Sequence, residues 1–105
     1  MLRMKPRLDE EAAKSLMALP QAVRVHVHRE IQRLAAHPTE LSRPASFPHP
    51  LEGQLFDTKC LVERTEHFIT LMFKYAADEQ HLDIVWIVHR QRPDPGLPLF
   101  PAKGD

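Results

Sequence analysis

The sequence predicts a single α+β domain in which a helical hairpin packs on a small, mainly antiparallel sheet. Three observations support this. Apolar residues recur at helical spacing in the first half of the chain and at strand spacing in the second half, and a proline-rich segment without a period, residues 38–54, lies between them. With a weak strand signal at the start, the expected order is β-α-α-β-β-β. The 105 residues suffice for one core.

Charge and cysteine content narrow the range of functions. The chain has 14 lysines and arginines against 14 acidic residues, so nucleic-acid binding would require a local basic patch. The single cysteine, Cys60, excludes an internal disulfide. Because no signal peptide and no apolar run of about twenty residues is visible, we expect a cytoplasmic protein without a membrane span.

An edge strand and a short helix are expected first. Apolar residues alternate with others in residues 1–8, and Pro6 suits a strand at the edge of a sheet. Asp9 is a residue type that commonly caps a helix, and two glutamates follow it. These features predict a helix over residues 10–19 whose apolar side is formed by Ala12, Ala13, Leu16, Met17 and Leu19.

Residues 21–37 carry a regular helical stripe. The apolar residues recur at spacings of four, four and three positions: Val23, Val27, Ile31 and Leu34. Pro20 separates this helix from the first, and Pro38 ends it. The pattern therefore predicts a helical hairpin. Residues 38–54 are expected to form a long loop from the helices to the sheet, and such a loop can carry function.

Three strands joined by short polar turns are expected to form an antiparallel meander. In residues 55–63 and 67–76, apolar residues alternate with polar or mixed ones, as in strands with one buried face. Residues 82–89 are apolar on both faces, which predicts a central strand. Simple alternation groups four of its residues on one face: Leu82, Ile84, Trp86 and Val88.

The last strand ends abruptly in charge. His89, Arg90 and Arg92 follow the apolar run, and a proline-rich tail over residues 93–105 comes after them. Polar residues are common where a strand leaves a sheet, so simple exposure is one interpretation. The other is a functional site, in which these three side chains would converge with Lys59 or Arg64 on one rim of the sheet.

The order of elements and several local patterns resemble the RelE/ParE superfamily of bacterial toxins from type II toxin–antitoxin modules. The resemblance covers residues 1–92, which are expected to form a single toxin domain, and it depends on the order and spacing of the patterns. These patterns are the Leu19–Pro20 break, IQRLAAHP (31–38), LEGQL (51–55), HFITLMFKY (67–75) and DIVWIVHRQR (83–92).

For RelE-type members, the resemblance implies a metal-independent endoribonuclease that cuts mRNA on the ribosome, without a cofactor, and that is neutralised by a cognate antitoxin. Basic and polar side chains would activate the ribose 2′-OH and stabilise charge on the phosphate. An arginine or lysine supplies fixed positive charge, and a histidine can exchange a proton near neutral pH. The catalytic candidates implied here are Arg64, His89 and Arg90, and the RNA- or target-binding candidates are Lys59, His67 and Arg92.

Two features depart from the RelE-type pattern. Thr70 stands three residues before Phe73, where an arginine is usual, and Arg64 in the preceding turn is a candidate replacement. The neutral net charge also differs from that of a typical ribosome-directed nuclease. The alternative is therefore a ParE-like toxin that inhibits DNA gyrase, or a non-catalytic binding domain of the same fold.

Other conspicuous residues have ordinary structural interpretations. His26 and His28 lie two positions apart, which on a helix directs their side chains differently and disfavours a shared metal ion. Cys60 and Trp86 are expected to pack in the core. The arginines of the second helix are expected to form either a solvated face or a surface for a partner or RNA: Arg24, Arg29 and Arg33.

Overall fold

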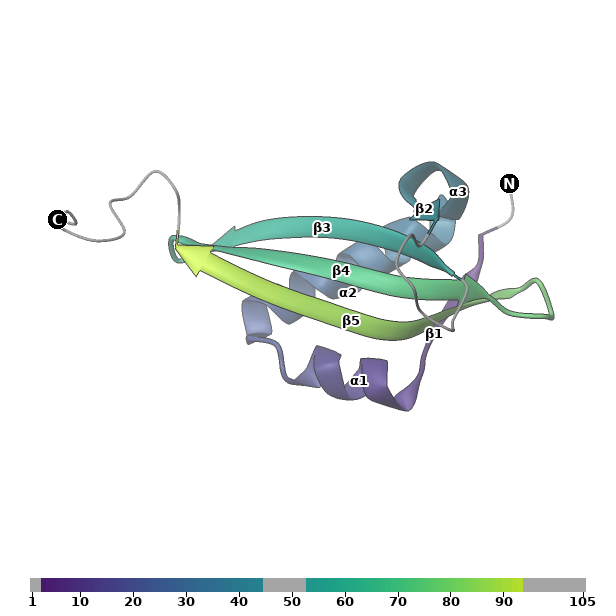
Figure 1. The fold of residues 1–105 in the computed structure, drawn as a ribbon, viewed down its shortest axis with the longest axis horizontal. Helices are drawn as coiled ribbons and strands as arrows, with labels where there is room; N and C mark the ends of the chain where they lie inside the picture. The colour runs from purple at the N-terminus through teal and green to yellow at the C-terminus, as the bar shows by residue number, and fades with distance from the viewer. Residues whose placement is uncertain (1–2, 45–52, 94–105) are drawn as a thin grey trace, which may run out of the picture.

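A computed structural model of the protein describes residues 3–44 and 53–93. The elements, in chain order, are β1 (Lys5–Leu8), α1 (Glu10–Met17), α2 (Gln21–Ala36), α3 (Pro38–Leu41), β2 (Arg43–Pro44), β3 (Gln54–Val62), β4 (Thr65–Tyr75) and β5 (His81–Pro93). They build a five-stranded sheet of order β1-β5-β4-β3-β2, with α1 and α2 packed on one face (Figure 1). The predicted α+β class is confirmed.

The sheet is antiparallel except at one edge. β3, β4 and β5 form the predicted meander, whereas β1 pairs with β5 in parallel, through Lys5–Leu8 against His81–Ile84. The parallel pairing needs a crossover connection, which the helices provide. Asp9 occupies the N-cap position of α1, although its side chain makes no capping hydrogen bond.

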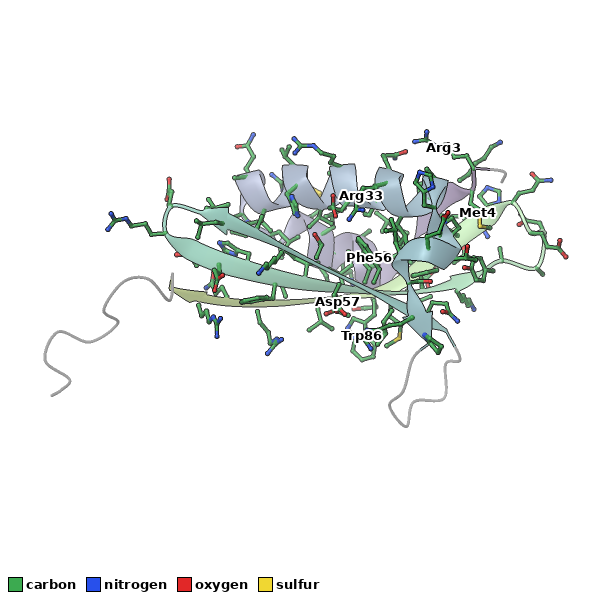
Figure 2. All side chains as sticks on the ribbon, turned by 90° about the horizontal axis from the view of Figure 1, so that it is seen from above. Arg3, Met4, Arg33, Phe56, Asp57 and Trp86 are labelled. Atoms are coloured by element: carbon green, nitrogen blue, oxygen red, sulfur yellow. The ribbon has the colours of Figure 1, made fainter. Side chains whose placement is uncertain are left out.

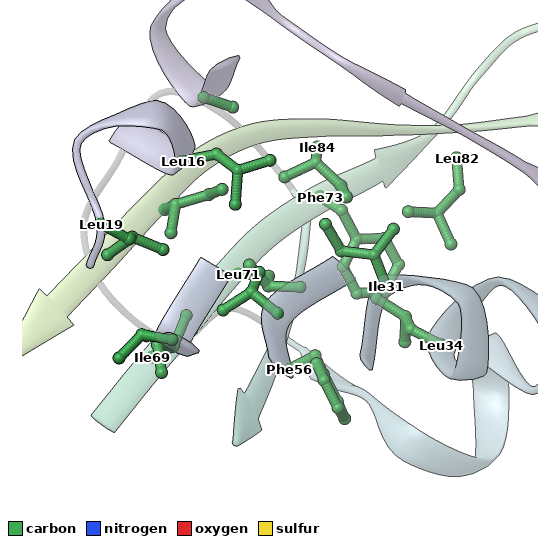
Figure 3. Packing of buried hydrophobic residues seen from close by; sticks show 14 residues of the cluster. Leu16, Leu19, Ile31, Leu34, Phe56, Ile69, Leu71, Phe73, Leu82 and Ile84 are labelled. Atoms are coloured by element: carbon green, nitrogen blue, oxygen red, sulfur yellow. The ribbon is translucent and has the colours of Figure 1, made fainter. Parts of the chain in front are cut away.

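The core lies between the helical pair and one face of the sheet (Figure 3). The predicted stripe of α2 is buried as expected. Among the residues that the structure describes, the largest fully buried side chain is Phe73 of β4. Two members of the apolar side predicted for α1 do not join the core. Ala13 is only partly buried, and Met17, at the end of the helix, is 66% exposed.

The prediction of an irregular loop over residues 38–54 was wrong for its beginning. Pro38 starts the single turn of α3, since a proline fits a first helical turn, and Arg43 and Pro44 then pair with β3 as the short edge strand β2. The loop residues 45–52 and the tail residues 94–105 lie outside the described residues. β5 itself continues to Pro93, one residue past the expected end of the domain.

A β-bulge in β5 corrects the prediction for Trp86. Met72 of β4 pairs with Trp86 but Phe73 pairs with Ile84, so Val85 is an extra residue on β5. The extra residue shifts the alternation by one position. Ile84 faces the helices, whereas Trp86 lies on the opposite face and is 44% exposed (Figure 2). The prediction that Trp86 lies in the core was therefore wrong.

The hairpin between β3 and β4 turns in two residues. Glu63 and Arg64 have φ angles of 51° and 67°. Positive φ at both central residues is the type I′ geometry that matches strand twist, although side chains other than asparagine, aspartate or glycine rarely adopt it. This turn places Arg64 at the same end of the sheet as the C-terminal end of β5 (Figure 1).

Gly53 allows the chain to enter β3 close to β4. A Cβ atom at this position would lie 2.6 Å from the carbonyl oxygen of Phe73. At an ordinary loop position, replacing glycine with alanine stabilises a protein by restricting the unfolded chain. Here we expect Gly53→Ala to lower the free energy of unfolding by about 1–3 kcal/mol, as overpacking does. Urea denaturation of the two proteins measures this, and an unchanged or higher midpoint would contradict the close approach.

Candidate functional site

The sheet face opposite the helices carries most of the charge of the strands. We call it the open face, because no described helix covers it (Figure 2). Alternation and register place on it the following basic residues: Lys5, Arg7, Arg43, Lys59, Lys74, Arg90 and Arg92. The carboxylates on this face are fewer, namely Asp57, Glu66 and Asp83. The open face is thus basic in a chain of zero net charge.

Each carboxylate of the open face is matched by an arginine. Arg7 binds Asp83 through Nε at 2.6 Å and Nη2 at 3.1 Å, which ties β1 to β5. Arg92 Nε donates to Glu66 Oε1 at 3.0 Å, and Arg43 pairs with Asp57. Among the described residues, these pairs leave four basic residues without a carboxylate partner: Lys5 and Lys74 near the start of β5, and Lys59 and Arg90 toward its other end.

The ring of Phe68 lies between Lys59 and Arg90. Lys59, Phe68 and Arg90 face one another on three neighbouring strands, because Phe68 pairs with Lys59 on one side and with Arg90 on the other. The guanidinium carbons of Arg90 and Arg92 lie 5.9 and 5.2 Å from the centre of the Phe68 ring, within cation–π range. We call Lys59, Phe68, Arg90 and Arg92 the cationic row.

Two hollows flank the Phe68 ring. One, of about 570 Å³, is lined by Phe68, Arg90, Gln91 and Arg92. The other, of about 280 Å³, is lined by Asp57, Thr58, Lys59 and Phe68. A planar apolar group can therefore approach Phe68 while an anion contacts the arginines or the lysine.

Thr70, at the position where an arginine is usual in the resembled family, belongs to a hydrogen-bond network beside the cationic row. Its hydroxyl donates to Asp57 Oδ1 at 2.7 Å, and Arg43 Nε and Nη2 donate to Asp57 Oδ2 at 3.1 and 2.7 Å. Burial alone would raise the pKa of Asp57. The hydrogen bonds from Thr70 and Arg43 outweigh it, and the pKa is lowered.

His67 and His89 lie on the face toward the helices, not with Arg90. They occupy the same face as the core residues Ile69 and Ile87, two positions away on each strand. Their rings stack with centroids 5.1 Å apart, and His67 Nδ1 lies 2.9 Å from His89 Nε2. The expected convergence of His89 with Arg90 and Lys59 was therefore wrong, because the side chains of successive strand residues point to opposite faces.

The structure thus divides the predicted site residues into three groups. Lys59, Arg90 and Arg92 lie together on the open face. His67 and His89 lie together beneath it, and exposed Arg64 lies in the turn at the end of the sheet. Sequence reasoning missed two residues. Phe68 could have been found, because it lies next to His67 in a predicted strand and points to the face opposite Ile69. Arg43 could not, because its segment was predicted to be a loop.

A second polar network joins the helices to the sheet. Glu30 of α2 is 9% exposed and accepts hydrogen bonds from Arg33 at 2.8 Å and from Thr58 of β3 at 3.1 Å. The bond from Arg33, with the help of Thr58, lowers the pKa of Glu30 against the effect of burial. His26 Nε2 lies 3.0 Å from the same threonine hydroxyl. This network is structural, since it fixes α2 on β3.

Cys60 lies beside this network and packs against the core, as predicted. Burial raises the pKa of its thiol, so the unreactive protonated form is favoured. Over residues 3–44 and 53–93, no group of three histidine, cysteine or acidic side chains is arranged to hold a metal ion. In the same ranges, no helix is long and apolar enough to span a membrane.

Comparison with known proteins shows which class of fold positions this site. The sequence matches no protein-family model and no curated protein. The structure, however, is similar to a chain of the RelBE2 toxin–antitoxin complex from Mycobacterium tuberculosis, with a TM-score of 0.63 and 18% identity, over 85% of this chain and 100% of that one. It is also similar to a chain of the Escherichia coli RelBE toxin–antitoxin complex, with a TM-score of 0.59 and 14% identity, over 85% and 99%.

These likenesses define the fold. Helices packed on a five-stranded, mostly antiparallel sheet form the RelE-like fold, and the fold that the sequence resemblance implied is confirmed. At these identities the likeness shows the fold alone, so the chemistry must be argued from this chain's own residues.

The histidine pair predicts how stability depends on pH. Burial, and then the neighbouring His67, lower the pKa of His89 below its usual value of 6.5. The unfolded chain therefore binds more protons than the folded chain just below pH 6.5. The contribution of His89 to the free energy of unfolding is therefore fully present above pH 6.5 and is lost as the pH falls below it. The carboxylates with lowered pKa values act in the same direction but nearer pH 4.

We expect the free energy of unfolding to fall between pH 7.5 and 5.5, and to fall less in His89→Gln. Urea denaturation at both pH values measures the difference. His28→Gln, which removes an exposed histidine of α2, is the matched control and should behave like the wild-type protein. Equal losses in all three proteins would show that the histidine pair does not govern this pH range.

Proposed function

We propose that the protein is the toxin of a type II toxin–antitoxin module and inhibits growth by cleaving mRNA on the ribosome. The observation that carries this proposal is the cationic row on the open face of a RelE-like fold. Lys59 and Arg90 have no carboxylate partner among the described residues, so their charge is free to meet a polyanion. The cationic row is thus the local basic patch that a chain of zero net charge needs in order to bind RNA.

The proposed reaction needs fixed positive charge more than any other feature. The ribose 2′-oxygen loses its proton and attacks the adjacent phosphorus, and the 5′-oxygen leaves as it gains a proton, which yields a 2′,3′-cyclic phosphate. Negative charge grows on the phosphate oxygens in the transition state. Arginine donors stabilise it because their planar fork matches those oxygens. Phe68 offers a surface on which a base can stack.

The roles of the residues follow their positions. We propose that Arg90, Arg92 and Lys59 contact the RNA, and that Arg64 extends the basic rim at the end of the sheet. The proton-transfer role expected for His89 stays a prediction. The lowered pKa keeps the imidazole neutral near pH 7, able to accept a proton, but Nε2 is engaged by His67.

A cognate antitoxin is the second part of the proposal. The relatives of this fold were solved as toxin–antitoxin complexes. We propose that an acidic, partly apolar segment of the partner covers the open face, where the basic residues lie beside exposed Val88 and Leu61. The same segment would then shield the residues used on RNA. A partner from the same operon that restores growth without lowering toxin levels would support this.

Arg90→Ala and Arg92→Ala should each abolish growth arrest. Arg90→Ala should leave the melting temperature nearly unchanged, because exposed charges contribute about 0.5 kcal/mol or less to folding. Arg92→Ala also removes the hydrogen bond to Glu66 and should lower the melting temperature slightly. Arg29→Ala is the matched control. It removes the same charge from an exposed position of α2, on the other side of the sheet, and should remain toxic. Growth, translation and gyrase supercoiling are measured for each variant.

Two results would contradict the proposal. If Arg90→Ala and Arg92→Ala remain fully toxic, the cationic row is only the polar end of a strand. If growth arrest is accompanied by loss of gyrase activity while mRNA stays intact, the ParE-like alternative is correct.

His89→Gln distinguishes proton transfer from packing. Proton transfer predicts a loss of cleavage of about 10²-fold or more, at an unchanged melting temperature. A packing role beneath Arg90 predicts a lower melting temperature, with cleavage largely retained well below it. Single-turnover cleavage and thermal denaturation of the same preparation separate the two.

A further inference from the structure

Arg43 reaches the open face from a different part of the chain than the cationic row. It lies on the two-residue edge strand β2, where it pairs with Leu55 of β3. Its guanidinium extends to Asp57, the next residue of β3 on the open face. Asp57 is two positions from Lys59, roughly 7 Å along the strand. Arg43 therefore lies beside the cationic row, although it comes 47 residues before Arg90 in the sequence.

The hydrogen bonds fix this guanidinium but, within the described residues, leave most of its donors unused. Of the five N–H groups of an arginine, one on Nε and one on Nη2 point to the single oxygen Oδ2 of Asp57. No described residue accepts a hydrogen bond from the other three donors, and the Arg43 side chain is 54% exposed. Asp57 is itself held, because its other oxygen accepts the Thr70 hydroxyl at 2.7 Å.

The same geometry is poorly suited to a purely stabilising ion pair. Both partners are about half exposed, with side-chain exposures of 54% and 48%, and exposed pairs contribute about 0–1 kcal/mol. A carboxylate in a basic face also weakens the attraction of that face for a polyanion. A role in positioning Arg43 would explain why Asp57 is nevertheless present there. Asp57 is near enough to Arg90 for that charge to lower its pKa further, so the network and the cationic row share one electrostatic environment.

We propose that Arg43 binds a phosphate of the single-stranded RNA that crosses the open face, and that Asp57 and Thr70 are positioning residues for its guanidinium. This inference rests on the proposed function. The sequence analysis named Arg64 as the candidate replacement for the arginine that is usual at position 70. The inference assigns that role to Arg43, at the edge of the sheet. It gives Thr70 a role through Asp57 rather than through a charge of its own.

The test uses a fluorescent single-stranded oligoribonucleotide with 2′-O-methyl riboses, which binds but cannot be cleaved. Affinity is measured over a range of salt concentrations for Arg43→Ala, Arg43→Lys, Asp57→Asn, Thr70→Val, Lys59→Ala and Arg29→Ala. Loss of one phosphate contact should weaken binding at low salt about tenfold, and should reduce the slope of log K against log salt by about 0.7. We expect this for Arg43→Ala and Lys59→Ala but not for the control Arg29→Ala.

Asp57→Asn is the decisive variant, because two accounts predict opposite signs. If Asp57 positions Arg43, its loss should weaken binding severalfold even though the open face becomes more positive, and Thr70→Val should do so to a smaller extent. If Asp57 is only a nearby negative charge, Asp57→Asn should bind RNA more tightly. Arg43→Lys should keep the salt slope while losing affinity, since a lysine retains the charge but not the fork.

The outcomes separate this inference from the proposed function. If Lys59→Ala weakens binding but Arg43→Ala and Asp57→Asn do not, the inference is wrong and the proposed function stands. If Arg43→Ala weakens binding only in proportion to a lower melting temperature, its role is structural and the inference is likewise wrong. If the wild-type protein does not bind the oligoribonucleotide at all, the inference is wrong, whereas the proposed function is judged separately by cleavage of mRNA on the ribosome.

Discussion

The β-bulge at Val85 decides which side chains of β5 meet the helices and which meet the open face. Before it, Leu82 and Ile84 face the core; after it, Ile87 and His89 do. Without the extra residue, unbroken alternation would direct Arg90 and Arg92 toward the helices, where unpaired charges are costly to bury. The bulge therefore allows one continuous strand to close the core at one end and to present its arginines on the open face at the other.

The two faces of the sheet carry different kinds of interaction. On the helix side, apolar burial dominates, and the polar groups there are satisfied by one another, as in the Glu30–Thr58 contact and the His67–His89 pair. On the open face, arginine–carboxylate pairs hold neighbouring strands together and leave Lys59 and Arg90 without carboxylate partners among the described residues. A chain of zero net charge can thus carry a locally basic surface suited to a polyanion.

The sequence predicted the parts of the fold that obey a regular period. The stripe of α2, the alternating faces of β3 and β4, and the edge position of β1 were all visible because burial of one face imposes that period. The short elements α3 and β2 were not, since a single turn and a two-residue strand are too short to show one. Trp86 was misplaced because a bulge is defined by the pairing with the neighbouring strand, which one strand's sequence does not contain.

The sequence predicted the location of the candidate site but not the arrangement of its side chains. The charges at the end of the last strand marked the right region, but their distribution between two faces depended on the bulge. Arg43 could not be predicted as a neighbour of Asp57, because their proximity arises from an edge pairing across the proline-rich segment. Residues brought together by long-range pairing leave no local pattern in the sequence.

We propose that the open face acts on mRNA held by the ribosome. The most direct measurement is primer extension on a defined mRNA incubated with the purified protein, with and without ribosomes carrying that mRNA. We expect new 5′ ends that require both the protein and the ribosome, and that carry a free 5′-hydroxyl. An mRNA that stays intact on the ribosome, at protein concentrations that arrest growth, would contradict it.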